Sequence, residues 1–264
     1  MRRFVIGDIH GCSKALRTLI DTIAPTEQDE LIFLGDYVDR GPDSRGVIDQ
    51  LVELQSRCNV VALRGNHEIM LCGVAFSHLP AEMWLNSGGN ATVTSYGGSL
   101  DKIPESHVKF LRGLRPHYET QNAIFVHANY DHTLPMEAQP DDIRYWTHLT
   151  RAPMPHCSGK RVYVGHTPQG NGMILDLGHL VCVDTYCFGN GYLTAMNVGT
   201  DECIQVDKKG FRRRVPAEAL FQFVGSAMRS VRALIRRQHS DEPPSPTEPD
   251  VSLPKSQGEN RPTD

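Results

Sequence analysis

Five short apolar runs in this chain are each followed by residues that can bind a metal ion. The runs cover residues 4–6, 31–34, 60–63, 124–126 and 162–164, and the candidate ligands that follow them are Asp8, His10, Asp36, Asn66, His127 and His166. Buried parallel strands have this continuous apolar pattern, and open α/β sheets bind their ligands just beyond the carboxyl ends of strands. The sequence therefore predicts an α/β protein in which six oxygen and nitrogen donors converge on one sheet edge as a metal site.

Helical patterns separate the first three runs. Ser13 precedes a helix with one apolar face that stops at Pro25, residues 44–55 repeat the pattern, and a third helix is predicted after Glu68. This β-α-β-α-β order predicts a parallel sheet with right-handed crossovers. Residues 78–120 contain two Gly-Gly pairs and are interpreted as a helical or loop insertion over the site.

The second half of the chain is rich in predicted strands up to about residue 206. The last four are expected to be antiparallel, at residues 173–175, 180–183, 192–197 and 203–206. We predict three regions: a principal domain over 1–210, a basic amphipathic helical segment over 211–238, and a disordered tail over 239–264. The helical segment is interpreted as packed on the domain or solvated, and contact with a membrane surface or a partner is the alternative.

Composition limits the classes of protein to which this chain can belong. Its net charge of −4 gives no global attraction to nucleic acid or membrane, and no apolar run approaches the roughly 18 residues of a membrane helix. Because the chain runs from Met1 almost directly into its first strand, no signal peptide is expected. Seven cysteines without a C-x-x-C pair are typical of reduced thiols, so we expect a cytoplasmic protein without a zinc–thiolate site.

The candidate ligands form a mixed set of imidazole, carboxylate and amide groups. Asp8 and His10 share one side of an extended segment, because side chains at i and i+2 lie on the same face. Asp36 supplies two oxygens, enough to bridge two cations. This set suits Mn²⁺, Fe or Zn²⁺ better than Ca²⁺ or Mg²⁺ alone. Two such ions about 3.5–4 Å apart would acidify a bridging water and hold a phosphoryl group for in-line attack.

Four further polar residues beyond the same runs fit the other needs of phosphoryl transfer. Arg40 and Arg64 could form bidentate contacts with phosphate oxygens, with ordinary salt bridges as the alternative. His67 could protonate the leaving oxygen as a general acid, with a structural cap as the alternative. Asp39 could bind the other ring nitrogen of His67 and keep that imidazole protonated.

This constellation resembles the phosphoprotein phosphatase family of calcineurin-like metallophosphoesterases, in its bacterial form. The motifs G-D-x-H-G, G-D-x-x-D-R-G and G-N-H-E stand at residues 7–11, 35–41 and 65–68, and two histidine motifs follow at His127 and His166. The resemblance covers residues 4–206 and implies that 1–210 is a catalytic α/β domain, a β-sandwich flanked by helices in four αββα layers. By position it implies two metal sites that share Asp36: Asp8, His10 and Asp36 for one ion, and Asp36, Asn66, His127 and His166 for the other.

The resemblance also marks what this chain lacks relative to eukaryotic members. Val164 stands where those members have a third arginine, and Tyr186-Cys187 lies in a loop that borders the site in family members. The remaining histidines have no comparable setting and are interpreted as surface or core residues: His78, His107, His117, His132, His148, His156 and His179.

The leading functional prediction is metal-dependent hydrolysis of phosphomonoesters on serine or threonine of phosphoproteins. Phosphotyrosine is a further candidate substrate. The reaction would use two divalent ions, Mn²⁺ first and Fe or Zn²⁺ as alternatives, with a phosphoprotein or phosphopeptide as partner. The alternative is hydrolysis of dinucleoside polyphosphates of the diadenosine tetraphosphate type. Related bacterial enzymes with that activity usually lack an aspartate at the place of Asp39 and have aspartate at the place of Glu68. A non-catalytic metal-binding scaffold is disfavoured, because His67, Asp39 and both arginines are all present.

Overall fold

Two β-sheets pack face to face in the computed structural model, which describes residues 1–214 and 217–223 of the 264-residue chain. The first sheet has the strand order β10-β9-β1-β2-β3. Its strands are β1 (Arg3–Ile6), β2 (Glu30–Phe33), β3 (Asn59–Ala62), β9 (Tyr192–Asn197) and β10 (Cys203–Asp207). Strands β1, β2 and β3 are parallel, as the sequence predicts, whereas β9 and β10 are antiparallel to their neighbours.

The second sheet has the strand order β11-β7-β8-β6-β5-β4. Its strands are β4 (His117–Glu119), β5 (Ala123–Val126), β6 (Arg161–Val164), β7 (Ile174–Asp176), β8 (Leu180–Cys182) and β11 (Phe221–Phe223). Strands β5, β6 and β8 run parallel. The prediction of four consecutive antiparallel strands after residue 173 is therefore wrong in part, because β7–β8 and β9–β10 are antiparallel pairs that belong to different sheets.

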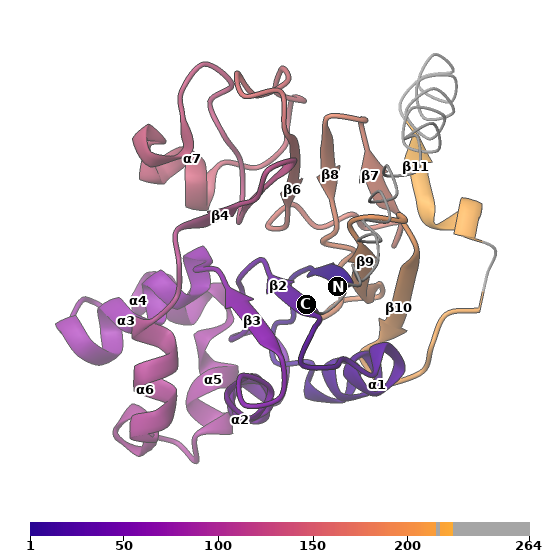
Figure 1. Cartoon of the computed structure of the whole chain (residues 1–264). Helices are drawn as coiled ribbons and strands as arrows, with labels where there is room; N and C mark the ends of the chain where they lie inside the picture. The colour runs from indigo at the N-terminus through magenta and orange to yellow at the C-terminus, as the bar shows by residue number, and fades with distance from the viewer. Residues whose placement is uncertain (215–216, 224–264) are drawn as a thin grey trace, which may run out of the picture.

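Helices cover the outer face of each sheet (Figure 1). The three predicted helices are α1 (Ser13–Ile23), α2 (Ser44–Leu54) and α3 (Asn66–Ser77). The 78–120 insertion is largely helical and contains α4 (Glu82–Trp84), a π-helical turn at Leu85–Gly89, α5 (Asn90–Ser95), a 3-10 turn at Leu100–Lys102 and α6 (Glu105–Arg112). A 3-10 turn at Met136–Ala138 and α7 (Asp141–Trp146) lie beside the second sheet.

The core has three apolar layers, which follow from the alternation of side chains along the strands. Phe4 and Phe33 face α1 and α2 with Leu16 and Leu51, whereas Val5 lies in the layer between the two sheets. That middle layer also holds Ile32, Val61, Phe125, Tyr163 and Val181. The outer face of the second sheet buries Ile124 and Val162 against Tyr130 and Met136. The four-layer αββα sandwich implied by the family resemblance is confirmed.

The end of the domain differs from the boundary expected at residue 210. Residues Ala217–Leu220 form a 3-10 turn, and β11 pairs in parallel with β7. Leu220 and Phe221 are buried in the layer between the sheets. The predicted helical segment 211–238 is therefore not helical at β11, and the domain includes this strand. Residues 215–216 and 224–238 of that segment and the predicted tail at 239–264 lie outside the described residues.

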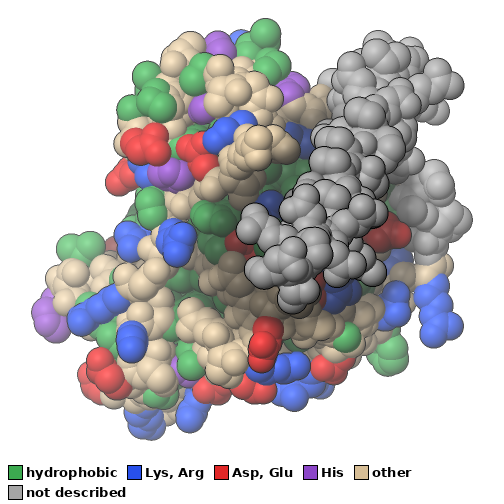
Figure 2. Space-filling model, in the orientation of Figure 1, with side chains coloured by type: hydrophobic (Ala, Val, Ile, Leu, Met, Phe, Trp, Pro, Cys, Tyr) green, Lys and Arg blue, Asp and Glu red, His purple; other side chains and the backbone are tan. Residues whose placement is uncertain are grey.

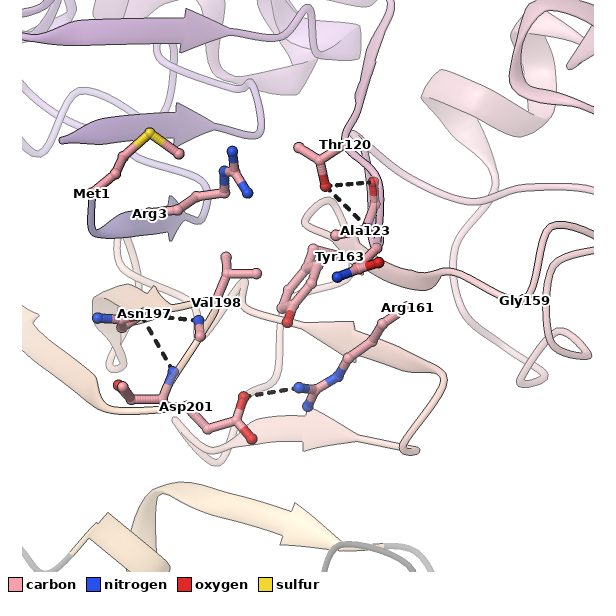
Figure 3. A pocket seen from close by; sticks show the side chains of 13 residues that line it. Met1, Arg3, Thr120, Ala123, Gly159, Arg161, Tyr163, Asn197, Val198 and Asp201 are labelled. Atoms are coloured by element: carbon pink, nitrogen blue, oxygen red, sulfur yellow. Dashed lines mark hydrogen bonds and ion pairs between the residues drawn. The ribbon is translucent and has the colours of Figure 1, made fainter. Parts of the chain in front are cut away.

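A cavity of about 820 Å³ opens between the sheets at the amino ends of β1, β5 and β6 (Figure 3). Arg161 crosses this gap, donating to Asp201 at 2.8 Å and to Asp176 at 3.1 Å. Glu30 of β2 makes a second contact between the sheets, because it accepts a hydrogen bond at 2.9 Å from Tyr118 of β4. Glu30 also pairs with Arg3 of its own sheet. Arg161 and Glu30 thus connect the two sheets at this end of the sandwich.

The face drawn in Figure 2 has positive and negative side chains interspersed over its helical half rather than gathered in one patch of a single sign. Among the described residues, none of the helices is both long and apolar enough to span a bilayer.

Candidate active site

The six predicted metal ligands lie together, just beyond the carboxyl ends of five strands. Asp8 and His10 follow β1, Asp36 follows β2, and Asn66 begins α3 after β3. His127 and His166 follow β5 and β6 of the second sheet. The expectation of one sheet edge is therefore corrected: the same ends of both sheets contribute.

Asp36 lies between two groups of close donor atoms. One group joins it to His10 and His67 and the other to His127 and His166, with the ligand atoms of each group within 4.8 Å of one another. Its Oδ2 lies 3.5 Å from His10 Nε2, and its Oδ1 lies 3.5 Å from His127 Nε2. One oxygen thus faces each group, which is the arrangement that a bridging carboxylate requires.

The hydrogen bonds of two imidazoles indicate that a cation fits between these groups. Burial lowers the pKa values of His10 and His127, so both rings are neutral near pH 7. Their Nδ1 atoms lie 2.9 Å from the Val38 carbonyl and 2.8 Å from the Leu34 carbonyl, which assigns the single ring proton to Nδ1. The Nε2 lone pairs then face Asp36. Opposed acceptors of this kind fit a bound cation, and on the His10 side the Arg40 guanidinium adds positive charge, with its Nη1 3.2 Å from His10 Nε2.

Asn66 adds a second set of opposed acceptors. Its Oδ1 lies 3.0 Å from His127 Nε2 and 3.0 Å from His166 Nδ1. An amide oxygen and two imidazoles are ordinary ligands of Mn²⁺, Fe and Zn²⁺. The donor set of the second group therefore fits a divalent transition metal.

Backbone strain is concentrated at this site. His10, Asp36 and His166 have positive φ values of 45°, 53° and 60°, a region that residues other than glycine rarely adopt. Each such residue costs on the order of 1–3 kcal/mol, and these outliers gather at functional sites. Close approach adds a further constraint, because a Cβ at Gly65 would collide with the Asp36 carboxylate and one at Gly165 with that of Asp8. Glycine at these two positions therefore lets the backbone approach the candidate ligands closely.

Asp8 lies outside both groups of close donor atoms. Its two oxygens accept hydrogen bonds from the His166 backbone at 3.0 and 3.2 Å. Burial and the nearby carboxyl groups of Asp184 and Asp36 raise the pKa of Asp8 well above its usual range. Burial also raises the pKa of Asp184 to about 7. This accumulation of buried carboxyl groups favours positive charge at the site.

His67 and Asp39 form the buried pair that the sequence predicts. His67 Nδ1 lies 2.7 Å from Asp39 Oδ2, and both side chains are almost completely buried. Burial by itself disfavours the imidazolium, but the carboxylates of Asp36 and Asp39 outweigh it and raise the pKa of His67. His67 Nε2 is 4.0 Å from Asp36 Oδ2, so a proton on Nε2 is directed into the site.

The helical insertion holds Asp39 in place. Trp84 Nε1 donates to Asp39 Oδ2 at 2.8 Å, and Thr92 Oγ1 donates to Asp39 Oδ1 at 2.6 Å. The insertion therefore lies against the site, as the sequence predicts. Trp84 and Thr92 were not predicted as contributors, because neither follows an apolar strand.

The two predicted phosphate-binding arginines lie in different settings. Arg40 Nη1 is 3.2 Å from His10 Nε2, and its guanidinium lies 4.6 Å from the Phe188 ring centroid. Arg64 instead donates to the Leu114 carbonyl at 3.3 Å. Arg40 thus contacts a candidate ligand, whereas Arg64 stands at the edge of the site.

Glu68 has a role that the sequence did not reveal beyond its place in a motif. Its carboxylate accepts backbone hydrogen bonds from Asp36 and Gly65 through Oε2, and from Tyr37 and Val38 through Oε1, at 2.8–3.3 Å. Glu68 therefore joins the loop after β2 to the start of α3, the two segments that carry Asp36 and Asn66.

Two aromatic rings that were not predicted as site residues also lie against the ligands. Phe188 packs edge-on to His10, with ring centroids 4.8 Å apart. His148 stacks on His166, with ring centroids 4.3 Å apart. From the sequence, His148 was interpreted only as a surface or core histidine. Neither residue follows an apolar strand, so the pattern that found the ligands could not find them.

Comparison with known proteins places this geometry among phosphoesterases. The family model described as calcineurin-like phosphoesterase matches residues 1–219. A symmetrical bis(5'-nucleosyl)-tetraphosphatase of Burkholderia pseudomallei is 44% identical over 69 residues, which are 26% of this chain and 24% of that protein. Serine/threonine-protein phosphatase 1 of Salmonella typhimurium is 40% identical over 88 residues, 33% of this chain and 38% of that protein. The chain thus matches only about a quarter to two fifths of the length of these relatives.

Among solved structures, one described as a candidate diadenosine tetraphosphatase superposes with a TM-score of 0.61. It is 21% identical, and the match covers 78% of this chain and 92% of that chain. This likeness shows the fold.

Proposed function

Because this chain belongs to the calcineurin-like phosphoesterase family, we propose that it is a metal-dependent protein phosphatase, which hydrolyses phosphomonoesters of serine and threonine, with tyrosine as a further substrate. The chain is a hydrolase of the metallophosphoesterase family, which is metal-dependent with a dinuclear site. What we propose beyond this family membership is the substrate, a phosphoprotein, and the metal, Mn²⁺, with Fe or Zn²⁺ as alternatives.

The observation that supports a phosphomonoester substrate is the buried pair of His67 and Asp39, 2.7 Å apart. The alkoxide that leaves phosphoserine or phosphothreonine is a strong base and needs a proton as the P–O bond breaks. The phosphate group that leaves a dinucleoside polyphosphate is already a stable anion. A protonated imidazole held by a dedicated carboxylate is therefore most useful for esters of alcohols.

The other site residues have roles that follow from their positions. The bound divalent ions supply an acidified water and neutralise charge on the phosphoryl group. Asp36, Asn66, His10, His127 and His166 would hold these ions, together with Asp8. Arg40 would bind phosphate oxygens from its place beside His10, and Arg64 from the edge of the site. His67 would give its Nε2 proton to the leaving oxygen.

A dinucleoside polyphosphate is the second candidate substrate. It is favoured by the 44% identity to the tetraphosphatase of Burkholderia pseudomallei over 69 residues. The Phe188 ring beside Arg40 is also a surface on which a base could stack.

The test compares kcat/KM of the Mn²⁺-loaded chain on phosphoserine, phosphothreonine and phosphotyrosine peptides and on diadenosine tetraphosphate. We expect the phosphopeptides to be preferred, and an Asp36→Asn variant, which removes the bridging charge, to be inactive on every substrate. A strong preference for the dinucleotide would overturn the proposal and support the second candidate.

We further propose that the protein acts in the cytoplasm on phosphoproteins. All seven cysteines are free in the structure, which is consistent with a reducing compartment. Fractionation of cells that produce the tagged chain tests this, and recovery outside the cytoplasm would contradict it.

A further inference from the structure

The second ring nitrogen of His166 lacks the support that the other candidate imidazole ligands have. His10 and His127 each hydrogen bond a backbone carbonyl through Nδ1, at 2.9 and 2.8 Å. Such bonds fix the plane and tautomer of a histidine ligand. Within residues 1–214 and 217–223, the buried Nε2 of His166 has no hydrogen-bond partner. Its Nδ1 lies 3.0 Å from Asn66 Oδ1 and is the atom that would bind the metal ion, so with an ion bound a contact other than a hydrogen bond must fix the plane of this ring.

His148 supplies that support through its ring face. The two rings are nearly parallel, at an angle of 17°, with centroids 4.3 Å apart. His127 packs edge-on to His166 with centroids 5.0 Å apart. His166 is therefore confined by one nearly parallel ring and one ring packed against it edge-on.

The segment that carries His148 is fastened to both histidine loops of the second sheet. The Leu149 backbone donates to Thr167 Oγ1 at 2.9 Å, one residue beyond His166. The Ala128 backbone, one residue beyond His127, donates to the Arg144 carbonyl of α7 at 3.0 Å. These two bonds place the end of α7 and the following residues firmly over the second group of ligands.

His148 has no other evident task among the described residues. Its side chain is exposed, and neither ring nitrogen forms a hydrogen bond there. A weak interaction with the backbone of Trp146 raises the pKa of His166, so the same segment acts on this ring at its edge as well as on its face. The ring face of His148 is thus its one specific contribution to the site.

We propose that His148 is a positioning residue, whose stacked ring fixes the plane of His166 and thereby sets the affinity of the second divalent-metal site. The inference rests on the dinuclear centre of the proposed function, but not on which phosphate ester is the substrate. Stacking suits a metal-bound imidazole, because coordination draws electron density from its ring. Loss of groups that orient a ligand typically weakens metal binding 10- to 100-fold.

The test is calorimetric titration of the metal-free, full-length chain with Mn²⁺, together with electron paramagnetic resonance of the Mn²⁺-loaded protein. The unaltered chain should bind two ions and show the signal of a coupled Mn pair. In His148→Ala, one of the two binding steps, assigned to the second site, should lose about tenfold in affinity, and the coupled signal should need more Mn²⁺. The other site should be unchanged.

Two further substitutions separate stacking from a polar role. His148→Phe keeps a flat ring without nitrogens and should restore the second site. His148→Asn keeps a polar group without a ring and should resemble alanine. His132→Ala, an exposed histidine with 47% side-chain exposure and no contact with the ligands, is the matched control and should not change binding.

The possible outcomes separate the role proposed for His148 from the proposed function of the protein. Equal Mn²⁺ binding by the alanine variant and the unaltered chain, or restoration by asparagine but not by phenylalanine, would overturn the role of His148 alone. Fewer than two ions bound by the unaltered chain would overturn the dinuclear centre and with it the proposed function.

Discussion

His67 lies between two carboxylates, 2.7 Å from Asp39 and 4.0 Å from Asp36, and these charges favour its protonated form. Replacing it by asparagine removes the proton donor but keeps a small polar side chain. We expect His67→Asn to lower kcat on phosphoserine peptides by about 100-fold or more, the usual contribution of a general acid. On an activated aryl phosphate, whose leaving group needs no proton, the loss should be several-fold at most.

The comparison of the two substrates is the control for this prediction. The same variant is measured with phosphoserine peptide and with p-nitrophenyl phosphate at saturating Mn²⁺. Equal losses on both would indicate that His67 acts on metal binding or folding instead.

Trp84 is expected to act through Asp39, because its indole donates to the same oxygen that binds His67. Trp84→Phe keeps most of the buried ring and removes one hydrogen bond. That bond is worth about 1.4 kcal/mol, so kcat on phosphoserine peptides should fall about tenfold. In an Asp39→Asn background the same change should have little further effect, since coupled residues are not additive. A full tenfold loss in both backgrounds would show that Trp84 acts by another route.

Asp29 gives the fold a pH dependence that is separate from the metal centre. Arg2 donates to its carboxylate at 2.6 Å and Thr26 donates at 2.9 Å, and the hydrogen bond from Arg2 is the largest cause that lowers the pKa of Asp29. A carboxyl whose folded pKa is depressed stabilises the fold above its unfolded pKa, near 3.9, and this contribution is lost as the pH falls toward the folded value.

We therefore expect Asp29→Asn to lower the free energy of unfolding by about 1–3 kcal/mol at pH 7. The difference from the unaltered chain should shrink steadily below about pH 4. Urea unfolding at a series of pH values measures it, and a difference that stays constant down to pH 2 would contradict the assignment.

Single residues were predictable from sequence where a strand end dictates their place. The six ligand candidates and His67 follow apolar runs, so topology alone brings them together. Trp84, Thr92 and His148 reach the site from helices and loops. Their positions depend on how distant segments pack, and no local pattern encodes that.

At the scale of elements, Arg161 connects the two sheets at the end of the sandwich that lies opposite the metal centre. Its guanidinium contacts Asp176 and Asp201, whose side chains are 3% and 16% exposed. Removing it takes away the cation that both of these carboxylates contact, which is costly for largely buried carboxylates. We expect Arg161→Gln to lower the free energy of unfolding by about 2–4 kcal/mol.

The neighbouring Lys160 offers a matched control. It pairs with Glu119 at 2.7 Å, and both side chains are 25% exposed. Lys160→Gln should cost about 1 kcal/mol or less, as for other exposed pairs. Both variants are compared by urea unfolding, and Mn²⁺ affinity is expected to stay unchanged. Equal small losses would show that Arg161 is not a structural connection between the sheets.

Apart from β4 and β11, which were not predicted, the strands were predictable to within about a residue, but their division into two sheets was not. The run at 180–183 and the run at 192–197 look alike in sequence, yet β8 joins the second sheet and β9 joins the first. Pairing depends on long-range contacts, such as that of β9 with β1, which period-2 alternation does not specify. The strand at Phe221–Phe223 was missed because the apolar stripe that surrounds it in the sequence, Leu220, Val224 and Ala227, has helical spacing.

For the whole molecule, the metal centre has a structural consequence, because both sheets contribute ligands. Asp36 follows β2 of the first sheet, and His127 and His166 follow strands of the second. Ions held by these residues would connect the two halves of the sandwich and relieve the repulsion between Asp8 and Asp36. The unfolded chain has no such arrangement, so ion binding is expected to stabilise the folded state selectively.

We therefore expect the melting temperature of the chelator-treated chain to rise with Mn²⁺ concentration. At a concentration 100 times the dissociation constant, each site adds about 2.7 kcal/mol to the free energy of unfolding. Differential scanning calorimetry over a range of Mn²⁺ concentrations measures the effect. Asp36→Asn should remove most of it, since that variant lacks the carboxylate shared by both groups. A melting temperature that is independent of Mn²⁺, or one that rises equally in the variant, would mean that metal binding does not couple the two sheets through Asp36.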